Sequence, residues 1–349
     1  MTSANGVLRI LYYGGAWPTN IGNAFIDLGA MALLRAAFPH AQLSFASEMP
    51  PWLFRYAVDD SPAGSPPGFA RRLFRRLKRR DSEVPRGFQH NALDICAVSA
   101  CDLVVFSGMA MCREFVDAQG PSLLKLAQQG VKILLLGTGA LCYDSEEKTI
   151  YAEFLKRVRP IGFVSRDDCS FEMFASLVEN SFRGIDCGFF VPEAFTPFKL
   201  NLPDYFVVNF DSTPEPELDT QGLLVTRAHH TFFGRVPRWH TQEPRTLVSD
   251  IPQDYLTLYA NCAGVYSDRV HACVATLAYG KRARLFGTTP RASLFDVVGA
   301  GRITKELVGV SPQLLAEKKE YQVSVVRRIV EDSMPAAAKG AVCTASNVR

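Results

Sequence analysis

Short apolar runs that alternate with longer amphipathic segments constrain the fold more than any other feature of this chain. Residues 7–13 (VLRILYY) are typical of a buried strand, and residues 21–38 follow with the apolar spacing of a helix. Further strand-like runs lie at residues 103–106, 131–136, 162–165, 205–210, 223–226, 264–267 and 283–286. Strands that alternate with helices predict a parallel sheet, and their apolar character predicts helices on both faces.

The length of the chain and a break in its pattern indicate two domains. At 349 residues it exceeds one ordinary domain, and prolines interrupt the pattern just before the strand-like run at 205–210. We therefore expect two doubly wound, Rossmann-like α/β domains that face each other across a cleft, at residues 1–200 and 201–335. A basic insertion is expected at about residues 50–85, and a disordered tail at residues 336–349.

Charge and cysteine content narrow the classes of partner. Residues 71–80 carry seven positive charges, more than the net charge of +3 for the whole chain. The remainder therefore lacks the broad basic face of a nucleic-acid-binding protein. The nine cysteines form no Cys-x-x-Cys pair, which argues against a zinc site and against a disulfide framework. With no basic leader segment at the N-terminus, a cytoplasmic location is the simplest expectation.

The basic segment has two interpretations. Arginines surround Leu73, Phe74 and Leu77 within residues 69–80, a pattern typical of a helix that lies on an anionic membrane surface. Peripheral contact of Arg71–Arg80 with the inner face of the membrane would follow. A solvated helix face explains the same charges and is the simpler interpretation.

An arginine and a histidine meet where a predicted strand passes into a predicted helix. Residues 262–266 are small and apolar, and residues 272–279 favour a helix. Arg269 and His271 thus follow the carboxyl end of a strand, where open α/β sheets bind ligands. Arg269 can bind an anion through its planar fork, and His271 can transfer a proton near neutral pH. A helix-capping arginine and a core histidine are the structural alternative.

Two other groups of polar residues carry weaker signals. The turn at Asn20, Gly22 and Asn23 begins a helix whose N-terminus can bind an anion, although a helix cap alone explains it equally well. His229 and His230 lie in an arginine-rich region that could contact an acceptor. We expect a solvated loop there, because no metal-like spacing or capping pattern fixes these groups.

Taken together, these motifs resemble the polysaccharide pyruvyltransferase family over about residues 7–300. The resemblance rests on an early Gly/Asn loop, an Arg-Asp pair, a strand ending in aspartate and a Ser-x-Arg-x-His-Ala block. These are Gly14, Asn20, Gly22 and Asn23; Arg166 and Asp167; Gly184, Ile185 and Asp186; and Ser267, Arg269, His271 and Ala272. Asn23 stands where the family usually has aspartate, and Ser107-Gly108-Met109 where it often has three glycines.

The resemblance implies a donor, an acceptor and a set of site residues. Family members transfer the enolpyruvyl unit of phosphoenolpyruvate to a saccharide and close it into a ketal across two hydroxyls; we expect no metal and no cofactor. His271 would be the general acid or base. The residues implied to bind phosphoenolpyruvate are Arg269, Arg166, Val270, Asn20, Gly22, Asn23 and Arg291, the last in place of a frequent lysine. We expect Arg166 and Arg269 to approach the donor from opposite walls of the cleft.

Two other functions stay open at this point. A GT-B-type glycosyltransferase that uses a nucleotide sugar fits the same GT-B-like architecture, but no acidic cluster in the second half stands out as a ribose-binding site. A non-catalytic relative that binds a saccharide is the other, and the presence of both Arg269 and His271 argues against it. For the leading interpretation, the acceptor is a saccharide for an exopolysaccharide or cell-surface glycan, either free or lipid-linked.

Overall fold

The computed structural model describes residues 7–15, 17, 20–47, 100–111, 113–141, 143–230 and 245–334. The expected basic insertion, with its segment Arg71–Arg80, and the expected tail lie outside these residues. Among the helices that the structure describes, none combines the length and the apolar character needed to cross a bilayer.

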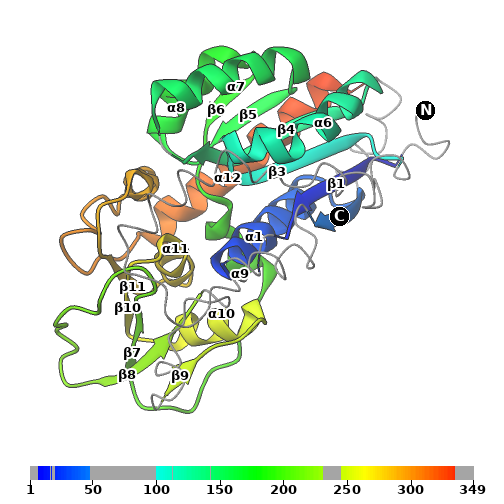
Figure 1. The fold of residues 1–349 in the computed structure, drawn as a ribbon. Coiled ribbons are helices and arrows are strands. Elements are labelled where there is room, and N and C mark those ends of the chain that lie inside the picture. Colours follow the sequence, from blue (N-terminus) through cyan, green and yellow to red (C-terminus); the bar gives the residue numbers. More distant parts are fainter. Residues whose placement is uncertain are drawn as a thin grey trace, which may run out of the picture.

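Two parallel β-sheets form the framework of the molecule (Figure 1). The first has the order β2-β1-β3-β4-β5-β6 and the second the order β11-β10-β7-β8-β9. The strands of the first are β1 (Arg9–Gly14), β2 (Gln42–Ser47), β3 (Leu103–Met111), β4 (Lys132–Ala140), β5 (Gly162–Ser165) and β6 (Ser181–Arg183). Those of the second are β7 (Tyr205–Asn209), β8 (Leu224–Ala228), β9 (Thr246–Leu247), β10 (Gly264–Ser267) and β11 (Arg282–Leu285). Neighbouring strands run parallel in both sheets, which confirms the predicted pair of parallel α/β domains.

Helices cover both faces of the first sheet, so its strands are apolar on both sides (Figure 1). Leu11 of β1 belongs to the core beneath α6 and α7, whereas its neighbour Tyr12 belongs to the core beneath α1. The α-helices are α1 (Gly22–Ala37), α6 (Arg113–Gln128), α7 (Ser145–Val158), α8 (Asp168–Phe174), α9 (Val191–Ala194), α10 (Pro252–Asn261), α11 (Val270–Ala278) and α12 (Pro312–Ser333). The 3-10 helices that the described residues form include η2 (Ala175–Leu177), η3 (Cys187–Phe190) and η5 (Pro290–Val298).

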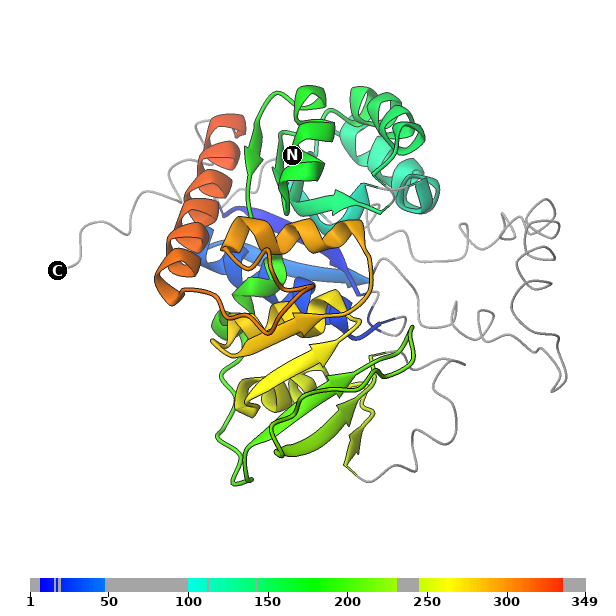
Figure 2. The ribbon, with the colours of Figure 1, turned by 90° about the vertical axis from the view of Figure 1, so that its left-hand side faces the viewer.

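The last helix, α12, returns from the end of the second half of the chain to the first sheet (Figure 2). Its Ile329 packs against Gly162 of β5, where a Cβ atom would come within 2.7 Å of the Ile329 side chain. In space, α12 therefore belongs with the first sheet although it follows the second in sequence. The domain boundary near residue 200 stays a prediction.

The two domains pack directly against each other along α1. One continuous apolar core includes Phe25 of α1, Phe189 of η3 and Val274 of α11. Within the first domain, α1 lies tightly against η3 at Gly29, where a Cβ atom would lie 1.8 Å from the carbonyl oxygen of Cys187. We call the region where the beginning of α1 and the residues after β6 meet the second domain the interdomain seam.

Substitution of Gly29 tests this packing. Gly29→Ala should lower the free energy of unfolding by about 3 kcal/mol, because the new methyl group collides with the backbone rather than with a movable side chain. Gly120→Ala in α6 is the matched control, since its Cβ would meet Phe154 at an ordinary contact distance of 3.4 Å. The control should gain up to about 1 kcal/mol from helix propensity. Urea unfolding measures both, and equal effects would contradict the packing described.

Candidate functional site

The turn between β10 and α11 is shaped by Ser267, which is fully buried. Its Oγ accepts a hydrogen bond from the N–H of Arg269 (2.8 Å) and donates one to the carbonyl oxygen of Asn209 (3.0 Å). Arg269 takes an extended conformation with φ −104°, and α11 begins at the next residue, Val270. The Val270 side chain is buried in the core, and a contact of this residue with a ligand stays a prediction.

Asp211, which follows β7, holds Arg269 in place. Its carboxylate accepts hydrogen bonds from Arg269 Nε (3.0 Å) and from the backbone N–H of His230 (2.9 Å). It also pairs with His229 Nδ1 (2.8 Å). Burial alone would raise the pKa of Asp211, but these neighbours outweigh it and lower that pKa to about 2. The charged carboxylate thus fixes the guanidinium through Nε. Among the described residues, no group of three or more histidines, cysteines or acids is arranged to hold a metal ion.

The expectation of a solvated loop at His229 and His230 was wrong. Their exposed fractions are 4% and 0%, because both residues follow directly on β8 and lie at the carboxyl edge of the second sheet. His230 Nε2 hydrogen-bonds Tyr259 Oη (2.5 Å), and burial lowers the pKa of His230 to about 3. The strand-like run at 223–226 was the signal in the sequence that could have placed both histidines at a strand end.

His271 lies on the second-domain side of the interdomain seam, in the first turn of α11, and is only 4% exposed. A Cβ atom on Gly22 would lie 2.9 Å from His271 Cβ and 3.3 Å from His230 Nδ1, so glycine is required where α1 approaches these rings. Asn20 Oδ1 accepts the N–H of Gly22 (3.0 Å), and the N–H of Asn23 bonds to the carbonyl oxygen of Asn20 (3.0 Å). The structure therefore brings the predicted Asn20–Asn23 turn against His271.

Asp186, which we did not propose as a site residue, faces His271 from the first domain. Its Oδ2 lies 3.6 Å from His271 Nε2, while its Oδ1 accepts the N–H of Gly188 (2.8 Å). Burial tends to raise the pKa of Asp186, but His271, Arg166 and the Gly188 N–H together bring it below its usual value. Asp186 is thus a buried carboxylate. The strand that ends in aspartate was its signal in the sequence.

Arg166 does not line an open wall, contrary to our expectation, because its side chain is fully buried. Its Nη2 donates to the carbonyl oxygen of Ala140 (3.0 Å), and its Nη1 lies 4.0 Å from Asp186 Oδ2. Burial opposes the charge, but Tyr143, Asp186 and Asp167 outweigh it and raise the pKa of Arg166. After His271, the charged guanidinium of Arg166 behind Asp186 contributes to keeping the pKa of that carboxyl low. A direct contact of Arg166 with a ligand stays a prediction.

Arg291 is a third arginine near the seam, at the beginning of η5. Its pKa is lowered, first by burial and then by repulsion from Arg166 and Arg269, which Tyr143 and Asp186 only partly offset. Arg291 thus lies close enough to both Arg166 and Arg269 to be repelled by their charges. An anion bound among them would relieve that repulsion.

Several buried polar atoms converge at the interdomain seam without a hydrogen-bond partner among the described residues. They are Arg166 Nη1, Asp186 Oδ2, His230 Nδ1 and His271 Nε2. Native proteins pair the great majority of such atoms, so a cluster of exceptions marks a place where a ligand or water completes the hydrogen bonding. The cluster combines charges of both signs with two imidazole rings, which suits the binding of an anion together with proton transfer.

Comparison with known families agrees with this geometry. The model of the polysaccharide pyruvyl transferase family matches residues 20–290, well over half of the chain. The chain belongs to this family. The matched region begins at Asn20 and includes Arg166, Asp186, Arg269 and His271. No curated protein matches the sequence.

Solved structures with a similar fold have low sequence identity. UDP-N-acetylglucosamine 2-epimerase from Rickettsia bellii has a TM-score of 0.53 at 13% identity, with 93% of this chain and 96% of that chain covered. A functionally uncharacterised protein from Klebsiella pneumoniae has a TM-score of 0.45 at 13% identity (87% and 93% covered). The glycosyltransferase SnogD from Streptomyces nogalater has a TM-score of 0.39 at 16% identity (96% and 98% covered). The first of these likenesses supports the GT-B-like architecture and carries no information on substrate.

The pKa of His230 predicts how stability depends on pH. The folded protein keeps this ring neutral down to about pH 3, whereas an unfolded histidine binds a proton below its ordinary pKa of 6.5. The free energy of unfolding should therefore fall as the pH drops from 6.5 towards 3, by about 1.4 kcal/mol per pH unit. His230→Gln, which keeps a polar partner for Tyr259, should flatten this dependence. Urea unfolding at pH 7, 6, 5 and 4 measures it; an unchanged slope would contradict the assignment.

Proposed function

We propose that this chain transfers the enolpyruvyl unit of phosphoenolpyruvate to a saccharide and closes it into a pyruvate ketal, in the biosynthesis of an exopolysaccharide or cell-surface glycan. Family membership supports a pyruvyl transferase. The observation that supports the proposed donor and reaction is the series of charge contacts from Arg166 to Asp186 and from Asp186 to His271, which joins the two domains across the seam.

The arginines supply the charge that such a donor needs. Phosphoenolpyruvate carries a carboxylate and a phosphate, so about three negative charges have to be offset in a small volume. Among the described residues, the ion pairs of Arg269 use only its Nε, which leaves its two terminal nitrogens for a bidentate contact. Arg291 adds a second charge, and the buried Arg166 adds a third from behind Asp186.

Proton transfer is the part of the reaction that falls to His271. A first sugar hydroxyl adds to C2 of the enol while C3 takes up a proton and becomes a methyl group. The C2–O bond to phosphate then breaks, a second hydroxyl adds to C2, and its proton leaves with the phosphate. The products are a ketal and inorganic phosphate, and each hydroxyl has given up one proton. The imidazole ring of His271 delivers the first proton or removes the second.

Asp186 gives His271 the partner that such a role requires. A carboxylate beside an imidazole stabilises the protonated ring and fixes its orientation. Because His271 is 4% exposed, a substrate that reaches its ring has to displace side chains at the seam or separate the domains there. Both groups would then contact the reacting atoms only in the complex.

Replacement of His271 tests the catalytic assignment. His271→Gln keeps a polar group of similar size but cannot carry a proton, so phosphate release from phosphoenolpyruvate and a saccharide should slow on the order of 10²–10⁴-fold. Arg183→Ala is the control, because it removes an exposed arginine whose ion pairs, with Asp168 and Glu172, are themselves exposed. Its rate should match that of the unchanged protein. A His271→Gln rate within twofold of that of the unchanged protein would contradict the role.

Donor choice separates the proposed function from its alternatives. In a thermal-shift measurement, phosphoenolpyruvate at 100 times its Kd should stabilise the protein by about 2.7 kcal/mol. Stabilisation by nucleotide sugars alone would favour a glycosyltransferase. No response to either donor would favour a relative that binds only the saccharide. Arg269→Lys should weaken the response to phosphoenolpyruvate, because lysine keeps the charge but loses the planar fork.

A further inference from the structure

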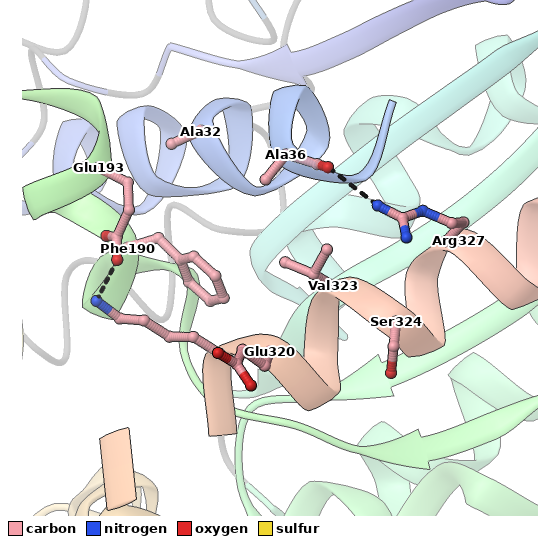
Figure 3. Close-up of a pocket in the computed structure, with 9 residues that line it drawn as sticks. Ala32, Ala36, Phe190, Glu193, Glu320, Val323, Ser324 and Arg327 are labelled. Carbon is pink, nitrogen blue, oxygen red and sulfur yellow. Dashed lines mark hydrogen bonds and ion pairs between the residues drawn. The ribbon is translucent and has the colours of Figure 1, made fainter. Parts of the chain in front are cut away.

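Among the described residues, polar side chains attach helix α12 to the first domain at three places, Lys319, Gln322 and Arg327. Figure 3 shows two of them, an ion pair between Lys319 and Glu193 (2.7 Å) and a hydrogen bond from Arg327 Nη2 to the carbonyl oxygen of Ala36 (3.2 Å). Both lie along the groove between α1, α9 and α12, where Lys319 and Arg327 are partly buried. They hold the helix on the domain without contact to the interdomain seam.

The third attachment is made by Gln322 and reaches the seam. Its amide Oε1 accepts the N–H of Ile185 (2.6 Å), and its Nε2 donates to the carbonyl oxygen of the same residue (3.2 Å). The Gln322 side chain is fully buried. One amide group thus satisfies both backbone groups of Ile185, as a neighbouring strand would.

Glycine at position 184 makes room for this contact. A Cβ atom there would come within 2.7 Å of Gln322 Oε1 and 2.8 Å of the carbonyl oxygen of Ser165. At Gly184 the chain therefore passes between α12 and the end of β5, and a side chain at this position would collide with both. The glycine and the glutamine form one arrangement, although 138 positions separate them in the sequence.

The residue after Ile185 is Asp186, whose carboxylate faces His271. The carbonyl group that Gln322 binds belongs to the peptide unit between Ile185 and Asp186. The Gln322 side chain therefore fixes the orientation of this peptide plane, and with it the direction in which the Asp186 side chain points. A peptide plane held in this way determines where Oδ2 lies relative to His271 Nε2, 3.6 Å away.

We propose that Gln322 is a positioning residue that sets the alignment of Asp186 against His271. The proposal rests on the proposed function, in which His271 transfers a proton. It assigns a role to α12, which lies beyond the matched family region that ends at residue 290. The second half of the chain thereby contributes to both sides of the seam. His271 of α11 lies on the second-domain side, and Gln322 of α12 acts on the first-domain side by positioning Asp186.

Gln322→Leu removes both hydrogen bonds and keeps the shape of the side chain. Its kcat should fall roughly tenfold, while the KM for phosphoenolpyruvate stays within about twofold, because the arginines are untouched. Arg327→Ala is the matched control, since it weakens the attachment of α12 without contact to Ile185. It should lose stability but keep its kcat within about twofold. Equal losses of kcat in the two variants would mean that Gln322 only stabilises the fold.

A double-mutant cycle shows whether Gln322 acts through Asp186. In an Asp186→Asn background, Gln322→Leu should cause little further loss of kcat, because the carboxylate that it positions is gone. Independent, multiplicative losses would overturn the proposal. Gln322→Glu tests for rescue by protonation. A protonated carboxyl can accept a hydrogen bond from the Ile185 N–H and donate one to the Ile185 carbonyl oxygen. The activity of this variant relative to the unchanged protein should therefore rise as the pH falls. A pH-independent ratio would count against the proposal.

The imidazole nitrogen resonances of His271 report the same alignment without turnover. They should shift in Gln322→Leu and stay unchanged in Arg327→Ala. If the unchanged protein shows no phosphate release with phosphoenolpyruvate, the proposed function fails, while the resonances still decide whether Gln322 positions Asp186. Unchanged resonances in Gln322→Leu would overturn the positioning role whatever the reaction.

Discussion

The proposed chemistry depends on the contact of Asp186 with His271 across the interdomain seam. A carboxylate with no exposure is costly unless a positive charge and hydrogen bonds compensate for lost water. Arg166 supplies the charge from behind, Gly188 supplies a backbone N–H, and His271 faces the remaining oxygen. Breaking this row on either side would leave a buried charge unpaired. The two domains are thus joined electrostatically at the place where the chemistry is proposed.

A second carboxylate does the corresponding work within the second domain. Asp211 keeps a pKa of about 2 because His229, His230 and Arg269 surround it, and it directs Arg269 through Nε. The two carboxylates have different effects, since Asp211 orients an anion-binding group while Asp186 faces a proton-transferring one. Their separation explains how one small region can hold a multiply charged anion and still move a proton beside it.

The sequence predicted the parts of this structure that depend on local pattern. Residues 162–165 and 264–267 were recognised as strands because short apolar runs lie between helix-like segments, and Arg269 and His271 were placed at a strand end by the same reasoning. The edge strand β2 was missed because residues 42–47 alternate weakly and do not form a continuous apolar run. Local patterns do not report long-range contacts, so the return of α12 and its contact through Gln322 could not be predicted. The burial of His229 and Arg166 also depends on charges that are distant in sequence.

A double-mutant cycle of Asp186→Asn and His271→Gln tests whether these two side chains act together in the reaction. The quantity to measure is kcat/KM for phosphate release that depends on phosphoenolpyruvate. If the two side chains act as one unit across the seam, the double variant should be little worse than His271→Gln alone, with a coupling of at least about 1.4 kcal/mol, or tenfold. Effects that multiply independently, with coupling below about 0.5 kcal/mol, would contradict this and show that the contact of Asp186 with His271 takes no part in the reaction.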